Sequence, residues 1–330
     1  MVCVAVRDET PSVRTFRLRP AKGRVPFIPG QALQIGLPLT SGAAWRSFTI
    51  SGAAGADLEL TVKAQGSEGA TGWMHAHLRE GVAIEARAPR GAFTLARRRS
   101  DRIALVSGGS GATPMIAMLR HLAETQPDAD VVWFHAAHEP AEVLFARELS
   151  ALQDVMSNLS VAICVSRVAP GWFGYRGRIS RPGMVAAVPD LGRREVFCCG
   201  PQGFMREVRL IHAAEGGDRT QFHTESFGAA AEPASQADAA PTDGAAFSLT
   251  VNGRTIAIHG EETILQAGLR QGVIIPSGCG EGMCGTCMVR RVSGEIACLP
   301  HGGLTPDEAA GGFVLACSSR ARSDVEISMG

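Results

Sequence analysis

Cys279-Gly-Glu-Gly-Met-Cys284-Gly-Thr-Cys287 is the stretch that decides how the chain is interpreted, and Cys317 follows it after a gap of 29 residues. Four thiolates at the spacing C-x4-C-x2-C with a distant fourth cysteine are the plant-type arrangement for two irons and two sulfides. Neighbouring glycines let the backbone wrap closely and direct N–H groups at the sulfurs, namely Gly278, Gly280, Gly282 and Gly285. The sequence therefore predicts a [2Fe-2S] cluster held by these four cysteines.

Two other interpretations of the cysteines were weighed against the cluster. Zinc also binds four cysteines, but its sites usually come as two close C-x2-C pairs. Disulfide bonding is the second alternative, although 330 residues can bury a core without cross-links and Met1–Thr10 contains no apolar signal segment. The odd count of nine cysteines and the iron–sulfur pattern both favour a reducing compartment, so we expect the protein in the cytoplasm.

The composition is that of a globular protein. A length of 330 residues favours two or three domains, and 45% hydrophobic with 19% charged residues is ordinary for soluble proteins. No apolar run approaches the ~18 residues of a transmembrane helix. There are 26 basic and 21 acidic residues through Phe227, against 6 and 8 from Ala246 onward. This asymmetry is too small to indicate nucleic-acid binding, and Arg97–Arg99 is interpreted as a solvated domain junction.

The first hundred residues contain short strands separated by glycine and proline clusters such as Phe27–Gly30. One short helix is expected at Trp73–Leu78. This pattern predicts an antiparallel β-barrel. The expected strands are Val2–Arg7, Val13–Arg19, Ala32–Leu37, Ser47–Ile50, Leu58–Ala64 and Ala83–Ala88.

Two segments of this barrel carry groups suited to a flavin nucleotide. Arg46-Ser47-Phe48-Thr49 places a fixed cation, a planar ring and a hydroxyl on one strand, where they could meet a phosphate, a flat ring and a polar edge. Ser67–Gly72 opens the short helix, and a glycine-rich helix N-terminus with a hydroxyl can bind phosphate. Taken alone, the first segment also fits an ordinary strand and the second an ordinary N-cap. His75 and His77 point to different helix faces and are not expected to bind metal.

The middle of the chain alternates strands and helices. Ile103–Ser107 is a continuous apolar strand that runs into Gly108–Pro114 and the helix Met115–Glu124, a layout that brings backbone amides to a pyrophosphate. The glycine turn lacks the G-x-G-x-x-G spacing. Further strands and helices predict a doubly wound α/β domain. They are Val131–Phe134, Val161–Val165 and Val196–Cys199, with helices near Val143–Leu152 and Phe204–Glu215.

Cys199-Gly200-Pro201 lies where the last of these strands ends, the place where open α/β sheets bind ligands. Cys198 and Cys199 could equally be small buried hydrophobic residues.

The last part of the chain is predicted to form a separate small domain. Residues 228–245 include no large apolar side chain, so we expect a flexible linker. Phe247–Val251, the turn Asn252-Gly253 and Arg254–His259 then predict a β-hairpin. Thr263 is expected to cap a helix that ends at Arg270. Together with the cysteine loop, these elements predict an independent domain.

In this order the motifs resemble those of the ferredoxin–NADP reductase superfamily, and the resemblance covers the chain except the linker. The family's R-x-Y-[ST] flavin motif matches Arg46–Thr49, with Phe48 at the tyrosine position. Its G-x-[ST] phosphate turn matches Gly69-Ala70-Thr71, its nicotinamide-dinucleotide turn matches Gly108–Pro114, and its C-G-P matches Cys199–Pro201. Trp172–Ile179 and His223–Phe227 look like the branch that serves Rieske-type demethylases of betaine-like compounds, and like the related reductase of the hybrid-cluster protein.

The resemblance implies a multidomain fold. Its parts are an antiparallel β-barrel flavin domain at 1–98, a doubly wound α/β NAD(P)-binding domain at 99–227, a flexible linker at 228–245 and an α+β (β-grasp) [2Fe-2S] ferredoxin domain at 246–330.

The implied activity is that of an NAD(P)H-dependent flavin iron–sulfur oxidoreductase. NADH would give a hydride to FAD, and single electrons would pass through the cluster to a separate Rieske-type oxygenase. FMN and NADPH are the alternative cofactors, the latter because Ser166-Arg167 could meet a 2′-phosphate. The alternative functions are the reductase of a hybrid-cluster protein and a non-catalytic redox sensor. The acceptor is expected on another chain, since neither a Cys-x-His pair nor a 2-His-1-carboxylate spacing occurs here.

The resemblance also assigns site residues. Phe227 would cover the flavin face that nicotinamide must reach, and Cys199 would flank the nicotinamide, so these two are the expected catalytic residues. The expected cofactor-binding residues are Arg46, Ser47, Phe48, Thr49, Val62, Lys63, Gly69, Ala70, Thr71, Gly108, Gly109, Gly111, Thr113, Pro114, Gly200 and Pro201.

Overall fold

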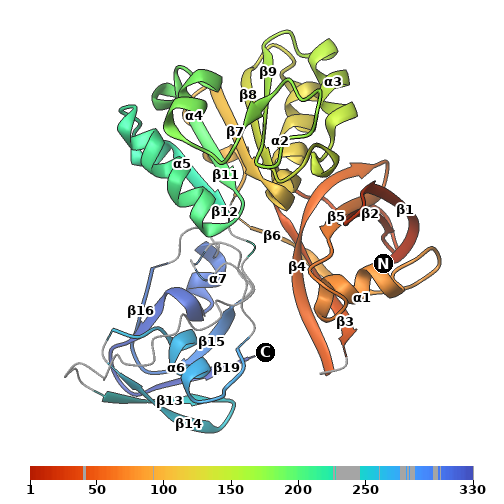
Figure 1. The fold of residues 1–330 in the computed structure, drawn as a ribbon. Helices are drawn as coiled ribbons and strands as arrows, with labels where there is room; N and C mark the ends of the chain where they lie inside the picture. Colours follow the sequence, from red (N-terminus) through yellow and green to blue (C-terminus); the bar gives the residue numbers. More distant parts are fainter. Residues whose placement is uncertain are drawn as a thin grey trace. The chain divides into compact units, whose positions relative to one another are not determined.

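The computed structural model describes residues 1–39, 42–91, 93–225, 227, 246–259, 261–275, 280, 282, 287–299, 304 and 306–329. By their contacts the residues form two compact units. The first comprises Met1–Pro89 and Phe93–Ser226, and the second comprises Arg90–Ala92 and Phe227–Gly330. Figure 1 shows the fold as a ribbon.

The first sheet closes into the predicted antiparallel barrel, with strand order β1-β2-β5-β4-β3-β6. The N–H of Cys3 donates to the carbonyl oxygen of Val82 over 2.9 Å, and the N–H of Ile84 donates to that of Met1 over 2.8 Å. These bonds join β1 to the segment that leads into β6. The strands are Val2–Thr10 (β1), Val13–Arg19 (β2), Ala32–Leu39 (β3), Gly42–Ala54 (β4), Asp57–Lys63 (β5) and Glu85–Arg90 (β6).

Two elements of the barrel differ in length from their predictions. β4 extends beyond the predicted Ser47–Ile50, because its hairpins with β3 and β5 pair Gly42 with Leu39 and Ala54 with Asp57. The helix α1 spans Gly69–His77, so it starts at Gly69 and not at Trp73. Met74 of α1 is fully buried and joins the apolar interior of the barrel.

The second sheet is parallel, with strand order β10-β9-β8-β7-β11-β12. The chain enters at the central strand β7, builds outward to β10 and returns to β11, so the order reverses between β7 and β11. Ligands of open α/β sheets bind at the carboxyl ends of the strands at such a point. The strands are Arg102–Gly108 (β7), Asp130–Ala137 (β8), Leu159–Val165 (β9), Tyr175–Arg176 (β10), Glu195–Cys199 (β11) and Phe222–Glu225 (β12).

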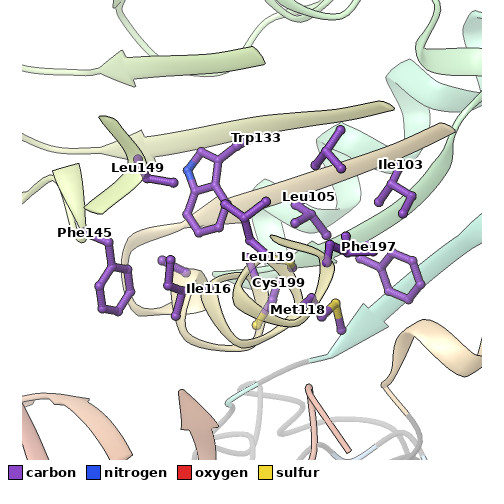
Figure 2. Packing of buried hydrophobic residues seen from close by; sticks show 14 of the residues in the cluster. Ile103, Leu105, Ile116, Met118, Leu119, Trp133, Phe145, Leu149, Phe197 and Cys199 are labelled. Carbon is purple, nitrogen blue, oxygen red and sulfur yellow. The ribbon is translucent and has the colours of Figure 1, made fainter. Parts of the chain in front are cut away.

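Helices cover both faces of this sheet, with α2 (Ala112–Thr125) and α3 (Ala146–Val155) on one and α4 (Arg181–Ala187) and α5 (Gln202–Ala214) on the other (Figure 1). Successive strand residues face opposite sides. Leu105 and Trp133 therefore pack with α2 and α3, as Figure 2 shows, while Val106 and Phe134 belong to the cluster with α4 and α5. Burial on both sides explains why the central strands are apolar without alternation.

The helix α3 begins at Ala146 and not at the predicted Val143. Phe145 precedes it with a left-handed backbone (φ 59°), which a right-handed helix cannot contain. The helix α4 and the two-residue strand β10 were not predicted, because such short segments carry no clear periodicity. Of the described helices, none is long and apolar enough to cross a membrane.

The second unit is a mixed five-stranded sheet, in the order β14-β13-β19-β15-β17, packed with a helix. The predicted hairpin of β13 and β14 is confirmed, with Asn252 (φ 48°) and Gly253 (φ 83°) in its turn. Thr263 caps α6 in a reciprocal capping box with Gln266. The elements are Ala246–Val251 (β13), Arg254–His259 (β14), Ile264–Arg270 (α6), Met288–Ser293 (β15), Ile296–Cys298 (β16), Pro306–Ala310 (α7), Phe313–Leu315 (β17), Ser319–Ala321 (β18) and Val325–Ser328 (β19).

Candidate functional site

The glycine turn after β7 and the turn after β11 are brought together by the sheet. Cys199 of β11 pairs with Ser107 of β7 in parallel register. A Cβ atom on Gly111 would collide with the carbonyl oxygen of Cys199, and one on Gly108 would lie 3.2 Å from Cδ of Pro201. Gly111 therefore has to be glycine for the two turns to touch, and a side chain at position 108 would crowd Pro201.

The same turn has an open side. Gly109 has a left-handed backbone (φ 54°), and no atom lies within 4 Å of where its Cβ would be. The turn leads through Gly109–Gly111 directly into α2, in which Thr113 donates its hydroxyl to the carbonyl oxygen of Ser110 over 3.1 Å and Pro114 is buried. A bare backbone at a helix N-terminus, with space beside it, fits the pyrophosphate of a dinucleotide.

Cys199 lies fully buried beside a carboxylate that sequence reasoning left without a role. Glu225 of β12 pairs with Cys199 in register and is also buried. Burial first, and then the charge of Glu225, raise the pKa of the Cys199 thiol well above its usual range. The thiol is therefore neutral at physiological pH. Glu225 stands at the end of its strand in the segment His223–Phe227, and this position was the only sequence signal available for it.

Glu225 also reaches the barrel. Thr49 of β4 donates its hydroxyl to Oε2 of Glu225 over 3.3 Å. Thr49, Glu225 and Cys199 thus form a buried chain of polar groups from the predicted flavin motif to the predicted nicotinamide turn. The structure brings these two motifs together although 150 residues separate them in sequence (199 − 49 = 150).

The remaining flavin-motif residues lie on β4 before Thr49. Arg46 is exposed and donates to the carbonyl oxygen of Trp45 over 3.0 Å, so its guanidinium stands at the surface. Ser47 is half-buried, and Phe48 is half-buried against the apolar interior of the barrel. A surface cation, a half-buried ring and a buried hydroxyl on one strand fit a nucleotide whose phosphate end is solvated and whose ring end is covered.

The predicted phosphate turn begins α1. Gly69 has φ +73°, which favours glycine, and Ala70 packs partly against the barrel interior. The hydroxyl of Thr71 accepts from the N–H of Gln65 over 3.1 Å, so it braces the preceding loop. The N-cap is Glu68, without a side-chain cap. The helix therefore begins without a side-chain cap.

Val62 and Lys63 end β5. The Val62 side chain is buried in the barrel interior and its carbonyl oxygen lies 2.9 Å from Nε2 of His75, whereas Lys63 Nζ lies 3.8 Å from Oε2 of Glu142. Any cofactor contact of Val62 would therefore involve its backbone. Phe227, which falls in the second unit, is 38% exposed.

Two of the four predicted cluster ligands are described, and their thiols converge. Sγ of Cys287 lies 3.1 Å from Sγ of Cys317, and the N–H of Gly282 donates to Sγ of Cys317 over 3.1 Å. A disulfide bond would need about 2.05 Å, so the pair is not a disulfide. Two buried thiols in contact, one of which accepts a backbone N–H, fit an iron–sulfur cluster. Cys279 and Cys284 lie outside the described residues.

Comparisons with known proteins agree with these motifs. Residues 105–210 match the oxidoreductase NAD-binding domain family, and residues 249–322 match the 2Fe-2S iron-sulfur cluster binding domain family. The stachydrine N-demethylase reductase subunit Stc4 of Rhizobium meliloti is 34% identical, over 98% of this chain and 95% of that one. The glycine betaine monooxygenase reductase subunit of Pseudomonas aeruginosa is 32% identical, over 98% and 93%.

Solved structures share the architecture. Phthalate dioxygenase reductase matches with a TM-score of 0.60 and 24% identity, over 99% of this chain and 97% of that one. The FAD/NAD-binding domain of nitric oxide dioxygenase from Vibrio cholerae matches with a TM-score of 0.63 and 26% identity, over 69% and 97%. The predicted multidomain fold class is confirmed.

The protein is thus an oxidoreductase that combines an NAD-binding domain with a [2Fe-2S]-binding domain. The chain belongs to the ferredoxin–NADP reductase superfamily, among the members that carry a C-terminal plant-type ferredoxin domain.

Proposed function

We propose that the protein transfers electrons from NADH through FAD and its [2Fe-2S] cluster to a separate Rieske-type oxygenase component. The observation that carries this proposal is the chain of Thr49, Glu225 and Cys199, which joins the flavin motif to the Cys199–Pro201 turn inside one unit. The relatives that cover 98% of the chain are reductase subunits of a demethylase and a monooxygenase. This supports an oxygenase as the acceptor.

A bound flavin supplies the conversion of a two-electron hydride donor into the single electrons that a [2Fe-2S] cluster accepts. Within the first unit, Arg46 is assigned to a flavin phosphate and the turn Gly108–Thr113 to the dinucleotide pyrophosphate. Thr49 Oγ1 is oriented by its bond to Glu225 Oε2. The Cys199 thiol keeps its proton, because burial and Glu225 raise its pKa, so it acts by contact and not as a base.

FAD is proposed over FMN, because family members that bind FMN have a phosphate turn richer in glycine and arginine. Gly69-Ala70-Thr71 followed by Trp73 resembles the turn of the FAD-binding members instead. The other proposed flavin contacts are Ser47, Phe48, Val62 and Lys63, and Gly200 and Pro201 complete the nicotinamide side. Acid release of the flavin followed by chromatography separates the two cofactors. Recovery of FMN would contradict both the assignment and the pyrophosphate role of Thr71.

NADH is proposed over NADPH, because Arg167, the cation expected to meet a 2′-phosphate, already pairs with a carboxylate. Arg167 follows β9 at its carboxyl end, and its Nη1 lies 3.3 Å from Oε1 of Glu139, which follows β8. A phosphate at Arg167 would meet the negative charge of Glu139, whereas a ribose hydroxyl could donate to it.

The proposed domain boundaries are 1–98, 99–227, 228–245 and 246–330, as the sequence predicts. The cytoplasm is the proposed location, because the described cysteines are free thiols, which are typical of a reducing compartment.

The test uses the purified holoprotein and two acceptors under anaerobic conditions. We expect NADH to bleach the flavin absorbance and to reduce a Rieske oxygenase encoded near the gene. Cys284→Ser should keep the first reaction and lose the second. If neither NADH nor NADPH bleaches the flavin, the reductase assignment is contradicted.

The second acceptor is a hybrid-cluster protein. It is favoured by the 30% identity, over 97% of this chain and 94% of that one, to the NADH oxidoreductase HCR of Escherichia coli. Faster reduction of this acceptor than of the Rieske oxygenase would overturn the oxygenase assignment while keeping the electron path.

A further inference from the structure

Arg120 of α2 holds the barrel against the α/β half of the first unit. Its Nη1 donates to the carbonyl oxygen of Ser51 on β4 over 2.9 Å and to Oε2 of Glu59 on β5 over 3.2 Å. Its Nε and Nη2 donate to the two carboxylate oxygens of Glu148 on α3 over 2.6 and 2.9 Å. One guanidinium therefore binds three elements from both halves of the unit.

The setting makes these bonds strong. The Arg120 side chain is 22% exposed and that of Glu59 only 8%, so the pair is largely removed from water. The contact with Glu148 is a two-pronged arginine–carboxylate pair, whose planar geometry fixes orientation as well as distance. A lysine could not reproduce it, because an ammonium group lacks the planar fork.

The backbone of β4 is adapted to this arginine. A Cβ atom on Gly52 would collide with Nη1 of Arg120 and would lie 3.2 Å from its Cζ. The three atoms nearest to this Cβ position all belong to Arg120, and the backbone of Gly52 does not have a left-handed φ. Gly52 is thus required for the close approach of Arg120 and not for the conformation of the strand.

The two elements joined by Arg120 are the ones that carry the two sides of the proposed hydride-transfer site. Ser51 stands two residues after Thr49 on β4, a distance of about 7 Å along a strand. Arg120 stands eight residues after Ala112 on α2, about 12 Å from the dinucleotide turn. Ser51 and Arg120 themselves belong to neither motif.

We propose that Arg120 is a positioning residue for hydride transfer, which sets the distance between the dinucleotide turn and the flavin motif through Ser51, Glu59 and Glu148. This inference rests on the proposed function. Hydride transfer needs reacting atoms about 3–3.5 Å apart, and a displacement of about 1 Å can cost about 100-fold in rate. Substrate affinity depends on the turn itself and changes little.

The experiment compares the wild type with Arg120→Gln, Gly52→Ala and the double variant. Measured quantities are the limiting rate of flavin reduction by NADH, the Kd for NAD⁺ by calorimetry, the flavin content and the melting temperature. We expect the limiting rate to fall about 10- to 100-fold in each single variant, with Kd and flavin content close to wild type. Arg120→Gln should also lower the melting temperature, because it removes a partner from the buried Glu59. Gly52→Ala keeps every charge, so it shifts the Arg120 guanidinium without removing the positive charge beside Glu59 and Glu148.

The double variant supplies the sharpest readout. If Gly52→Ala acts by displacing Arg120, it adds nothing once Arg120 is absent, and the combined rate equals that of Arg120→Gln alone. The matched control is Arg17→Gln, because Arg17 lies 3.3 Å from the other oxygen of Glu59 but bonds only within the barrel. We expect it to keep the wild-type rate.

Three outcomes would overturn the positioning role. They are wild-type limiting rates in Arg120→Gln and Gly52→Ala, an additive double variant, and an equal loss of rate in Arg17→Gln. A wild-type protein whose flavin is not reduced by either nucleotide would instead refute the proposed function itself. The two failures are therefore distinguishable.

Discussion

Lowering the pH from about 7.5 to about 5 is expected to destabilise the α/β half of the first unit through one residue, His135. The His135 side chain is fully buried on β8, and its Nδ1 lies 2.9 Å from Oγ of Ser107. Its Nε2 has no hydrogen-bond partner among the described residues. Burial lowers the pKa of His135 from 6.5 to about 4, because a charged ring cannot be solvated there.

Stability falls as the pH is lowered, because the unfolded state binds the His135 proton at a higher pH than the folded state does. Below pH 6.5 the unfolded chain protonates this histidine, whereas the folded chain resists until about pH 4. The stability contribution is therefore complete above pH 6.5 and is lost as the pH falls toward 4. The loss is about 2 kcal/mol at about pH 5 and about 3 kcal/mol once the pH is well below both pKa values, at about 1.4 kcal/mol per pKa unit.

The assay is urea unfolding of the wild type and His135→Gln at several pH values. Glutamine can still form a hydrogen bond with Ser107 but does not titrate between these values, so the difference in unfolding free energy between the two proteins should change by about 2 kcal/mol over this range. The exposed His138 provides the control His138→Gln, which should run parallel to the wild type. A constant difference between wild type and His135→Gln at all pH values would refute the reasoning.

Three further changes test the cofactor sites. Cys284→Ser should lose iron and sulfide while keeping flavin, because the cluster ligands and the flavin motif lie in different units; recovery of zinc in anaerobically purified wild type would contradict the cluster. Phe227→Ala should keep flavin and iron but change nicotinamide affinity, because the resemblance implies that its ring covers the flavin and must move before hydride transfer. Unchanged reduction kinetics with a stability loss of about 3–5 kcal/mol would show that Phe227 is a core anchor instead. Glu139→Gln should raise the NADPH-to-NADH ratio of kcat/KM about fivefold by releasing Arg167, the equivalent of about 1 kcal/mol for an exposed ion pair; an unchanged ratio would place the 2′-phosphate elsewhere.

Local sequence was sufficient wherever a feature depends on neighbouring residues. The hairpin turn Asn252-Gly253 needs two left-handed residues in succession, and these residue types supply them. The turn that begins at Gly108 needs a backbone without side chains between a strand and a helix, and the glycines in the sequence indicate such a turn. The same holds for the cysteine spacing, because one loop supplies three of the four predicted ligands.

Sequence was insufficient where a distant contact decides. The left-handed Phe145 moves the start of α3, yet phenylalanine gives no sign of that conformation. In the sequence, Glu225 is one more acidic residue at a strand end. Only the folded structure shows that it pairs with Cys199 in the sheet and accepts a hydrogen bond from Thr49 of the barrel.

Arg120 shows most clearly why the rest of the site could not be predicted. On a helical wheel it is an ordinary polar residue of an amphipathic helix, and Gly52 is an ordinary glycine near a strand end. The structural roles of Arg120 and Gly52 depend on each other, because Gly52 leaves the space that the guanidinium fills. Its hydrogen-bond acceptors are Ser51, Glu59 and Glu148. Motifs mark the groups that touch a cofactor, since chemistry restricts them to few residue types. The contacts that set the distance between motifs are restricted only by shape, and shape is visible only in the folded chain.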